Sequence, residues 1–309
     1  MASGGRRETR LAPNPCFLFS SLQIEGRQLR AGVVIPGDSP LFEGHYPGHP
    51  ILPAIGHLAL LAAALAGGHV KGSFAEVPAL RLRHPVGPGE SLDLAADLAA
   101  ADGTVRFALS RGREPVSLGT VRLARLLDGG SSPGKVRAEP PRHLANQAVL
   151  GHSTESGPAD RPGTGGSGGR GFPSPATLIS HASPARLVES IVEAGEKNIV
   201  CEAAIPENHP LVRGGRAPGF AALEAAAQAA AVLEAWQRRG ASSGPRVGYL
   251  VGIRDARFAG ELPAGRLLRV TARLTASLLP LCRYDVGVEL DGAERAAGTV
   301  STYLVEQPG

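Results

Sequence analysis

The chain has 309 residues, enough for two domains of ordinary size that each bury a core. Hydrophobic residues make up 43% of it and charged residues 19%, which excludes a chain that is disordered throughout. The net charge of +4 is small and the arginines are scattered, so the sequence favours no nucleic-acid partner.

The sequence also argues against a membrane segment and a disulfide framework. It contains no apolar run of the ~18 residues that a membrane span needs, and its start, MASGGRRETRLAPNP, has no apolar segment behind the arginines. We therefore expect a cytoplasmic protein with no membrane partner. Cys16, Cys201 and Cys282 are widely separated, a spacing that predicts neither paired cysteines nor a zinc site.

The first predicted domain covers residues 14–127, after a disordered N-terminus at residues 1–13. Residues 17–36 alternate as strands do around a glycine turn, and residues 54–68, rich in Ala and Leu, form a predicted helix. Residues 77–123 then consist of alternating segments broken at Gly, Pro and Asp, which is typical of antiparallel strands.

The second predicted domain covers residues 176–306. It is separated from the first by residues 128–175, a stretch dominated by Gly, Pro and Ser that predicts a flexible linker. Within the second domain we expect strands in residues 185–206, a helix over residues 221–240 and further antiparallel strands in residues 247–304.

The two halves share an order of parts that indicates a tandem duplication. VVIPGDSPLFEG in the first half resembles AAIPENHPLVRG in the second, and a GTV triplet starts at Gly119 and again at Gly298. Short segments repeated in the same order favour a repeated unit. Both predicted helices are apolar around most of their circumference, so each should be enclosed. We predict an α+β fold in which a long helix is wrapped by an antiparallel sheet, twice.

One turn in the first half resembles that of a known family. GHYPGHPILPA, residues 44–54, is similar to the signature turn of the bacterial 3-hydroxyacyl-acyl carrier protein dehydratases of type II fatty acid synthesis, which have the hotdog fold. The matching positions are His45, Tyr46, Pro47, Gly48, Pro50 and Pro53, while Ala54 stands where the family has glycine. The resemblance implies two tandem hotdog domains that form a pseudo-dimer.

The family also carries an acid on the central helix, followed one turn later by glutamine, and the two halves differ there. In the first half these positions hold Ala59 and Ala63; in the second half they hold Glu224 and Gln228. Residues at i and i+4 share one helix face. The second half has instead lost the histidine, because its shortened turn places Gly215 at that position.

The two losses are complementary. In the resembling family, each site takes its histidine from one subunit and its carboxylate from the partner subunit. Carried onto this chain, the resemblance implies that His45 and Glu224 meet in one complete site, and that Gly215 and Ala59 meet in a second site without either group.

The resemblance implies dehydration by an acid and base pair. Neutral His45 would remove the C2 proton of a 3-hydroxyacyl thioester, and Glu224, its pKa raised by apolar surroundings, would protonate the leaving hydroxyl. No metal or redox cofactor is expected.

Four further residues receive roles by the same resemblance. The backbone N–H of Ala54, with Gly48 in the turn, would stabilise charge on the thioester oxygen. Gln228 would orient the acid, and Tyr46 would pack beside the site. The other histidines of this region and of the second-half turn are interpreted as structural or solvated: His49, His57, His84 and His209.

The predicted function is dehydration of 3-hydroxyacyl thioesters to trans-2-enoyl thioesters in fatty acid or polyketide biosynthesis. The substrate would be carried on the phosphopantetheine of an acyl carrier protein or on coenzyme A, and the chain could pair with itself or with another hotdog subunit. Three alternatives stay open: a non-catalytic acyl-binding or carrier-docking accessory subunit of a dehydratase complex, a double-bond isomerase, and a thioesterase.

Overall fold

The structure is a computed structural model that describes residues 14–98, 102–124, 171–239 and 246–306. The predicted disordered segment 1–13 and most of the predicted linker, up to residue 170, lie outside the described residues, so these predictions and the domain boundaries stay predictions.

Each half supplies six strands to one sheet. The first half contributes β1 (Leu18–Glu25), β2 (Gln28–Val34), β3 (Phe74–Leu82), β4 (Ser91–Asp97), β5 (Thr104–Arg111) and β6 (Glu114–Leu123). The second half contributes β7 (Val188–Ala194), β8 (Asn198–Ala203), β10 (Arg246–Phe258), β12 (Leu268–Leu278), β13 (Leu281–Leu290) and β14 (Ala293–Glu306). Two short strands, β9 (Arg216–Ala217) and β11 (Leu262–Pro263), pair separately.

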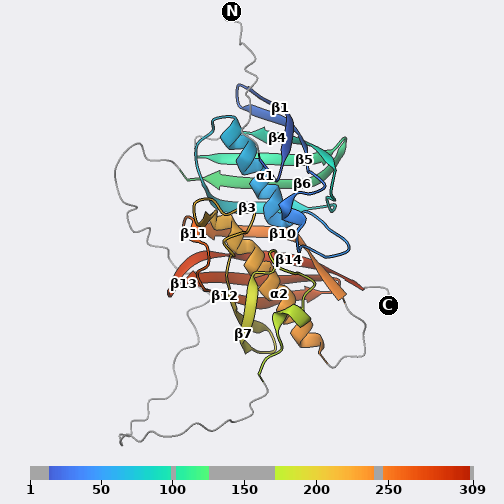
Figure 1. The fold of residues 1–309 in the computed structure, drawn as a ribbon, viewed down its shortest axis with the longest axis vertical. Helices are drawn as coiled ribbons and strands as arrows, with labels where there is room; N and C mark the ends of the chain where they lie inside the picture. Colours follow the sequence, from blue (N-terminus) through green and yellow to red (C-terminus); the bar gives the residue numbers. More distant parts are fainter. Residues whose placement is uncertain (1–13, 99–101, 125–170, 240–245, 307–309) are drawn as a thin grey trace, which may run out of the picture. The chain divides into compact units, whose positions relative to one another are not determined.

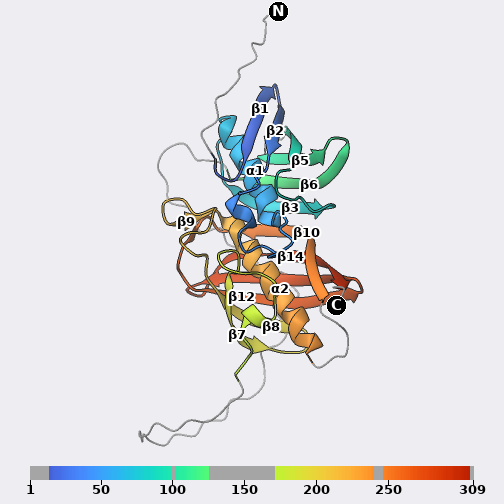
Figure 2. The same cartoon turned by 45° about the vertical axis from the view of Figure 1, so that its right-hand side comes forward.

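The strand order confirms the predicted duplication. Within the described residues, twelve strands form one antiparallel sheet in the order β1-β2-β4-β5-β6-β3-β10-β14-β13-β12-β8-β7. Counted from each outer edge of the sheet to its middle, the two halves have the same strand order. In the first half this order is β1, β2, β4, β5, β6, β3, and in the second half it is β7, β8, β12, β13, β14, β10. The halves join where β3 pairs with β10, with Leu80 opposite Ile253 (Figures 1 and 2).

The two long helices lie along the same face of this sheet (Figure 1). They are α1 (Ala54–Gly67) and α2 (Ala222–Arg238), close to the predicted ranges, and they contact each other. Leu58, Leu60 and Leu61 of α1 are all inaccessible to solvent although they point in different directions, so the helix is enclosed as predicted. Among the described residues, no helix is both long and apolar enough to cross a membrane.

The strands alternate as the sequence pattern predicts. In β4, Leu92, Leu94 and Ala96 are buried between exposed neighbours, because successive side chains of a strand point to opposite faces. The buried faces of both sheet halves form one hydrophobic core with the helices. The turn before α1, which carries His45, and the start of α2, which carries Glu224, therefore rest on one shared core.

Candidate active site

His45 sits in a tight turn that fixes its ring. The turn bends at Gly44 (φ 75°), Tyr46 (φ 58°) and Gly48 (φ 83°), a backbone region that glycine adopts easily and tyrosine rarely. His45 Nδ1–H donates to the carbonyl oxygen of Ile51 at 2.7 Å. That hydrogen bond selects the tautomer whose Nε2 carries the free lone pair, the atom a general base uses.

Glu224 lies in the first turn of α2 and is buried. Gln228, one turn further on, donates from Nε2 to Glu224 Oε1 at 3.1 Å and to the carbonyl oxygen of Ala185 at 2.8 Å. The other amide atom of Gln228 accepts hydrogen bonds from the N–H groups of Leu187 and Val188, at 2.8 and 3.3 Å. Gln228 thus joins the acid to the segment that enters β7.

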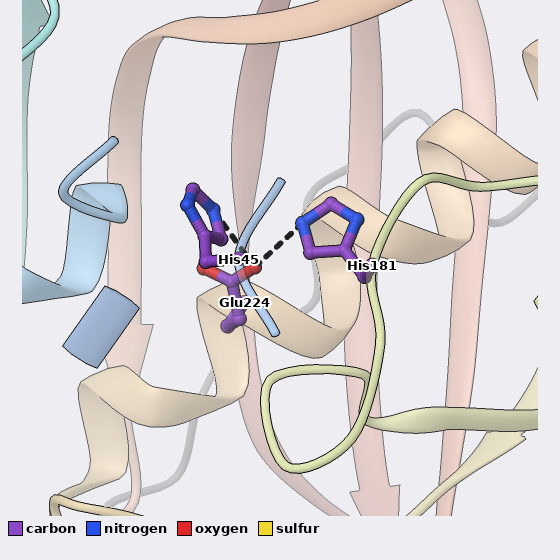
Figure 3. Close-up of side chains that lie close together, drawn as sticks. All are labelled: His45, His181 and Glu224. Atoms are coloured by element: carbon purple, nitrogen blue, oxygen red, sulfur yellow. Dashed lines mark ion pairs between the residues drawn. The ribbon is translucent and has the colours of Figure 1, made fainter. Parts of the chain in front are cut away.

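The structure brings His45 and Glu224 together. His45 Nε2 lies 4.0 Å from Glu224 Oε1, and both side chains are buried (Figure 3). The distance is too long for a hydrogen bond and leaves room for one bridging group, which is common in sites without substrate. The catalytic roles of the two residues stay predictions.

A third side chain, His181, completes the cluster and was not predicted. It lies on the segment before β7, where no local pattern distinguishes it, and it is 8% exposed. Its Nε2 is 3.5 Å from Glu224 Oε1, and its ring packs 5.0 Å from the His45 ring at 72°. Figure 3 shows the two imidazoles on either side of the carboxyl group.

Burial keeps His45 neutral. Loss of hydration, opposed in part by the nearby Glu224 carboxyl, lowers the pKa of His45 to about 4. At neutral pH the imidazole is therefore unprotonated and able to accept a proton.

The pKa of Glu224 is lowered, whereas the sequence led us to expect a raised pKa. Burial raises it, as expected, but the His181 hydrogen bond, the charges of His45 and His181 and the Gln228 hydrogen bond outweigh burial and lower the pKa to about 2. The position of Glu224 in the first turn of a helix acts in the same direction. These contacts favour the ionised carboxylate, opposite to the protonated acid that apolar surroundings alone would favour.

A cavity of about 480 Å³ opens onto these groups. His45, His181 and Glu224 line it together with apolar side chains from both halves: Leu52, Leu82, Ala227, Ala231, Leu250 and Val251. Its surface is thus an apolar wall with a few converging polar groups, the usual composition of a small-molecule site.

The remaining predicted residues divide between the cavity and its surroundings. Ala54 lines the cavity as the first residue of α1, where a backbone N–H has no partner inside the helix. Tyr46 lines it too; its hydroxyl donates to the carbonyl oxygen of Gly248 at 2.9 Å, and burial raises its pKa. Gly48 is exposed in the turn and is not among the lining residues, nor are Ala59 and Gly215.

Histidines outside the cluster have separate environments. His57 of α1 reaches the cavity but is buried against Ser117 Oγ, 3.0 Å from its Nδ1. His84 is exposed and lies 3.2 Å from Glu114. His209 Nδ1 accepts the N–H of Leu211 at 3.2 Å.

The cluster has the donor atoms of a metal site. The nearest donor atoms of His45, His181 and Glu224 all lie within 4.8 Å of one another. Two imidazole nitrogens and a carboxylate oxygen suit divalent transition metals. Acid and base dehydration needs no metal, and the expectation of no metal cofactor stays a prediction.

Each half of the chain matches a dehydratase family model. A model described as ApeI dehydratase matches residues 21–120, and one described as ApeP dehydratase matches residues 173–308.

Curated relatives match the chain over shorter stretches. The 3-hydroxyacyl-[acyl-carrier-protein] dehydratase FabZ of Thermus thermophilus is 33% identical over 88 residues, 26% of this chain and 62% of that protein. FabZ of Syntrophotalea carbinolica is 39% identical over 72 residues, 20% of this chain and 48% of that protein. The chain thus spans less than two thirds of the length of these relatives.

Solved structures match nearly the whole chain in fold. The dehydratase domain from the CurJ module of curacin polyketide synthase aligns with a TM-score of 0.60 at 11% identity, covering 95% of this chain and 97% of that domain. The dehydratase domain of RzxB from Pseudomonas fluorescens aligns with a TM-score of 0.59 at 17% identity, covering 96% of this chain and all of that domain (100%). The predicted α+β double hotdog is confirmed. The resemblance to hotdog dehydratases holds in both domains of the tandem, since the first matches the ApeI dehydratase model and the second the ApeP dehydratase model.

Proposed function

We propose that this chain dehydrates 3-hydroxyacyl thioesters, carried on an acyl carrier protein, to trans-2-enoyl thioesters in fatty acid or polyketide biosynthesis. The observation that carries the proposal is the 4.0 Å approach of His45 Nε2 and Glu224 Oε1 at one cavity. The two groups come from different halves, and each half lacks the other group at the position where the resembling family carries it. The name of the curated relatives supports the carrier-bound substrate.

The proposed reaction begins at His45. Its neutral Nε2 removes a proton from C2 of the substrate, and negative charge develops on the thioester oxygen. The N–H of Ala54, at the positive end of the α1 dipole, stabilises that charge.

Glu224 then acts as the acid, with a proton that it receives during the reaction. Because its pKa is low, it starts as a carboxylate. The imidazolium formed at His45 passes its proton to this carboxylate, which delivers it to the C3 hydroxyl. The C3–O bond breaks, the C2–C3 double bond forms, one water molecule leaves, and both side chains return to their starting protonation states.

The cavity supports an acyl substrate that enters from solvent. Its apolar side chains suit the acyl chain, and Arg83, exposed at the lining, offers positive charge to an acidic carrier. We expect no cofactor apart from the phosphopantetheine that carries the substrate.

Single-turnover assays with 3-hydroxybutyryl and 3-hydroxyoctanoyl carrier protein test the proposal. The wild type should form the enoyl product, and His45→Ala and Glu224→Gln should each lower the rate by ~100-fold or more, the loss typical of a missing general acid or base. His69→Asn, which removes an exposed histidine outside the cavity lining, is the matched control and should keep the wild-type rate.

Two results would contradict the proposal. If the folded wild type binds both acyl carriers and converts neither, the chain is an accessory acyl-binding subunit. If it releases free acid or a shifted double bond without a trans-2-enoyl product, the thioesterase or isomerase alternative replaces dehydration.

A further inference from the structure

The cluster of His45, Glu224 and His181 contains a buried titratable side chain, His181, to which the proposed reaction gives no role. We propose that His181 is a positioning residue for Glu224: it holds the carboxyl group at Oε1 and so leaves Oε2 for proton transfer to the substrate. This inference rests on the proposed function, since it names how the acid of that same site is oriented.

The backbone that carries His181 is fixed from two directions. The next residue, Ala182, donates its N–H to the carbonyl oxygen of Gly44 at 2.8 Å, so the segment is attached to the turn that holds His45. On the C-terminal side of His181, the side chain of Gln228 in α2 donates to the carbonyl oxygen of Ala185 and accepts from the N–H groups of Leu187 and Val188. The segment therefore has little freedom to move His181 away from the acid.

The imidazole ring is also restricted by its neighbours. It lies 5.0 Å from the His45 ring and 5.0 Å from the Tyr46 ring, at 72° and 53°. Tyr46 is itself anchored through its hydroxyl to Gly248. Packed rings of this kind remove side-chain rotamers, which is what a residue that orients another group requires.

The contacts of the Glu224 carboxyl group are one-sided. Gln228 Nε2 lies 3.1 Å from Oε1, His181 Nε2 lies 3.5 Å from Oε1, and His45 Nε2 lies 4.0 Å from the same atom. In the described part of the chain, the hydrogen bond of this carboxyl group and its nearest nitrogen contacts all involve Oε1. Because Gln228 of α2 and His181 of the segment before β7 hold Oε1, Oε2 is the oxygen left to contact the C3 hydroxyl group of the substrate.

The second ring nitrogen of His181, Nδ1, supports a functional role for this histidine. Nδ1 is buried and has no hydrogen-bond partner in the described residues. When Nε2–H of a neutral imidazole donates to Glu224, Nδ1 remains an acceptor without a donor, which costs stability. Most buried polar atoms of a native protein have a hydrogen-bond partner, and exceptions are common at functional sites.

Two amide substitutions separate the proposed role from simple packing. The amide nitrogen of glutamine can lie near the place of Nε2, whereas the shorter asparagine reaches only the place of Nδ1. We expect His181→Asn to lower kcat on the order of 100-fold, as misorientation of a reacting group does, with KM within a few-fold. His181→Gln should recover most of kcat. Thermal unfolding of both variants checks that they are folded.

A double-mutant cycle tests whether His181 acts through Glu224. In the Glu224→Gln background, His181→Asn should cause no further loss of kcat, because the carboxyl group it positions is absent. The proposal is overturned if the two losses multiply, or if the Asn and Gln variants at position 181 lose activity equally.

An activity-independent measurement keeps this inference separate from the proposed function. The imidazole ¹⁵N resonances of His181 should move in Glu224→Gln and stay in place in Glu114→Gln, which removes an exposed carboxyl near His84. If the wild type dehydrates nothing but His181 responds in this way, the proposed function fails and the contact stands. If His181 does not respond to Glu224→Gln, the positioning role is wrong whatever the activity.

Discussion

Ala182 donates its backbone N–H to the carbonyl oxygen of Gly44 at 2.8 Å, which joins the two halves directly beside the candidate site. The contact places His45, which follows Gly44, next to His181, which precedes Ala182. The positions of His45 and His181 thus depend on one backbone junction between halves that are far apart in the sequence.

Gly44→Ala should disrupt this junction. Gly44 has φ 75°, and an added Cβ would collide with the carbonyl of Ala182, so we expect about 1 to 3 kcal/mol of overpacking on top of the left-handed backbone penalty. Gly26→Ala is the control, because Gly26 has φ 59° and open space around it; it should cost about 1 to 2 kcal/mol. Urea unfolding measures the free energy of unfolding of both variants. Equal losses of stability would show that the added Cβ at position 44 causes no collision with Ala182.

The pH dependence of kcat/KM should follow neutral His45. Since burial lowers the pKa of His45 to about 4, the base stays available well below the usual range of histidine and is lost only as pH falls through about 4. In the proposed reaction Glu224 starts ionised and receives its proton from His45, so its own titration should not lower kcat/KM near neutral pH. Rapid pH-jump assays give the profile; a decline of kcat/KM above pH 5 would show instead that Glu224 must start protonated.

His57 should make the folded protein less stable in mild acid. Burial lowers its pKa from 6.5 to about 4, so between these values the unfolded chain binds more protons and stability falls as pH drops. Above pH 6.5 this effect is absent. One such group amounts to about 3 kcal/mol over the window.

His57→Asn removes this titration while keeping an amide near the place of Nδ1, where it can bond to Ser117. The slope of unfolding free energy against pH, from urea titrations at pH 7, 6 and 5, should therefore be shallower than in the wild type. His84→Gln removes an exposed histidine and should leave the slope unchanged. Matching slopes for wild type and His57→Asn would mean that His57 is not held neutral.

Gln228 should matter for stability as well as activity. Gln228→Ala leaves the buried amides of Leu187 and Val188 without their acceptor, and each such group costs about 1 to 3 kcal/mol. Gln237→Ala, at an exposed position of the same helix, should stay within about 0.5 kcal/mol of the wild type. Urea unfolding separates the two, and similar values for both would contradict the anchoring role of Gln228.

The local sequence predicted the helices and strands, and it identified His45 and Glu224 among the three residues of the cluster. The Ala and Leu runs predicted both helices to within a few residues, because a helix apolar all round must be enclosed. Alternation predicted the strands, as in β4, and the spacing of Glu224 and Gln228 placed them on one face of α2. The turn residues around His45 predicted the base through family resemblance alone.

Tertiary structure decided the rest of the site. The approach of His45 to Glu224 depends on the pairing of β3 with β10 and on the Gly44 to Ala182 junction, contacts between distant residues that no local pattern encodes. His181 lies outside any helix or strand and becomes notable only because folding places it beside Glu224. The pKa values follow the same reasoning: burial alone would raise that of Glu224, and the N–H donors and imidazoles that folding brings to Oε1 reverse its direction.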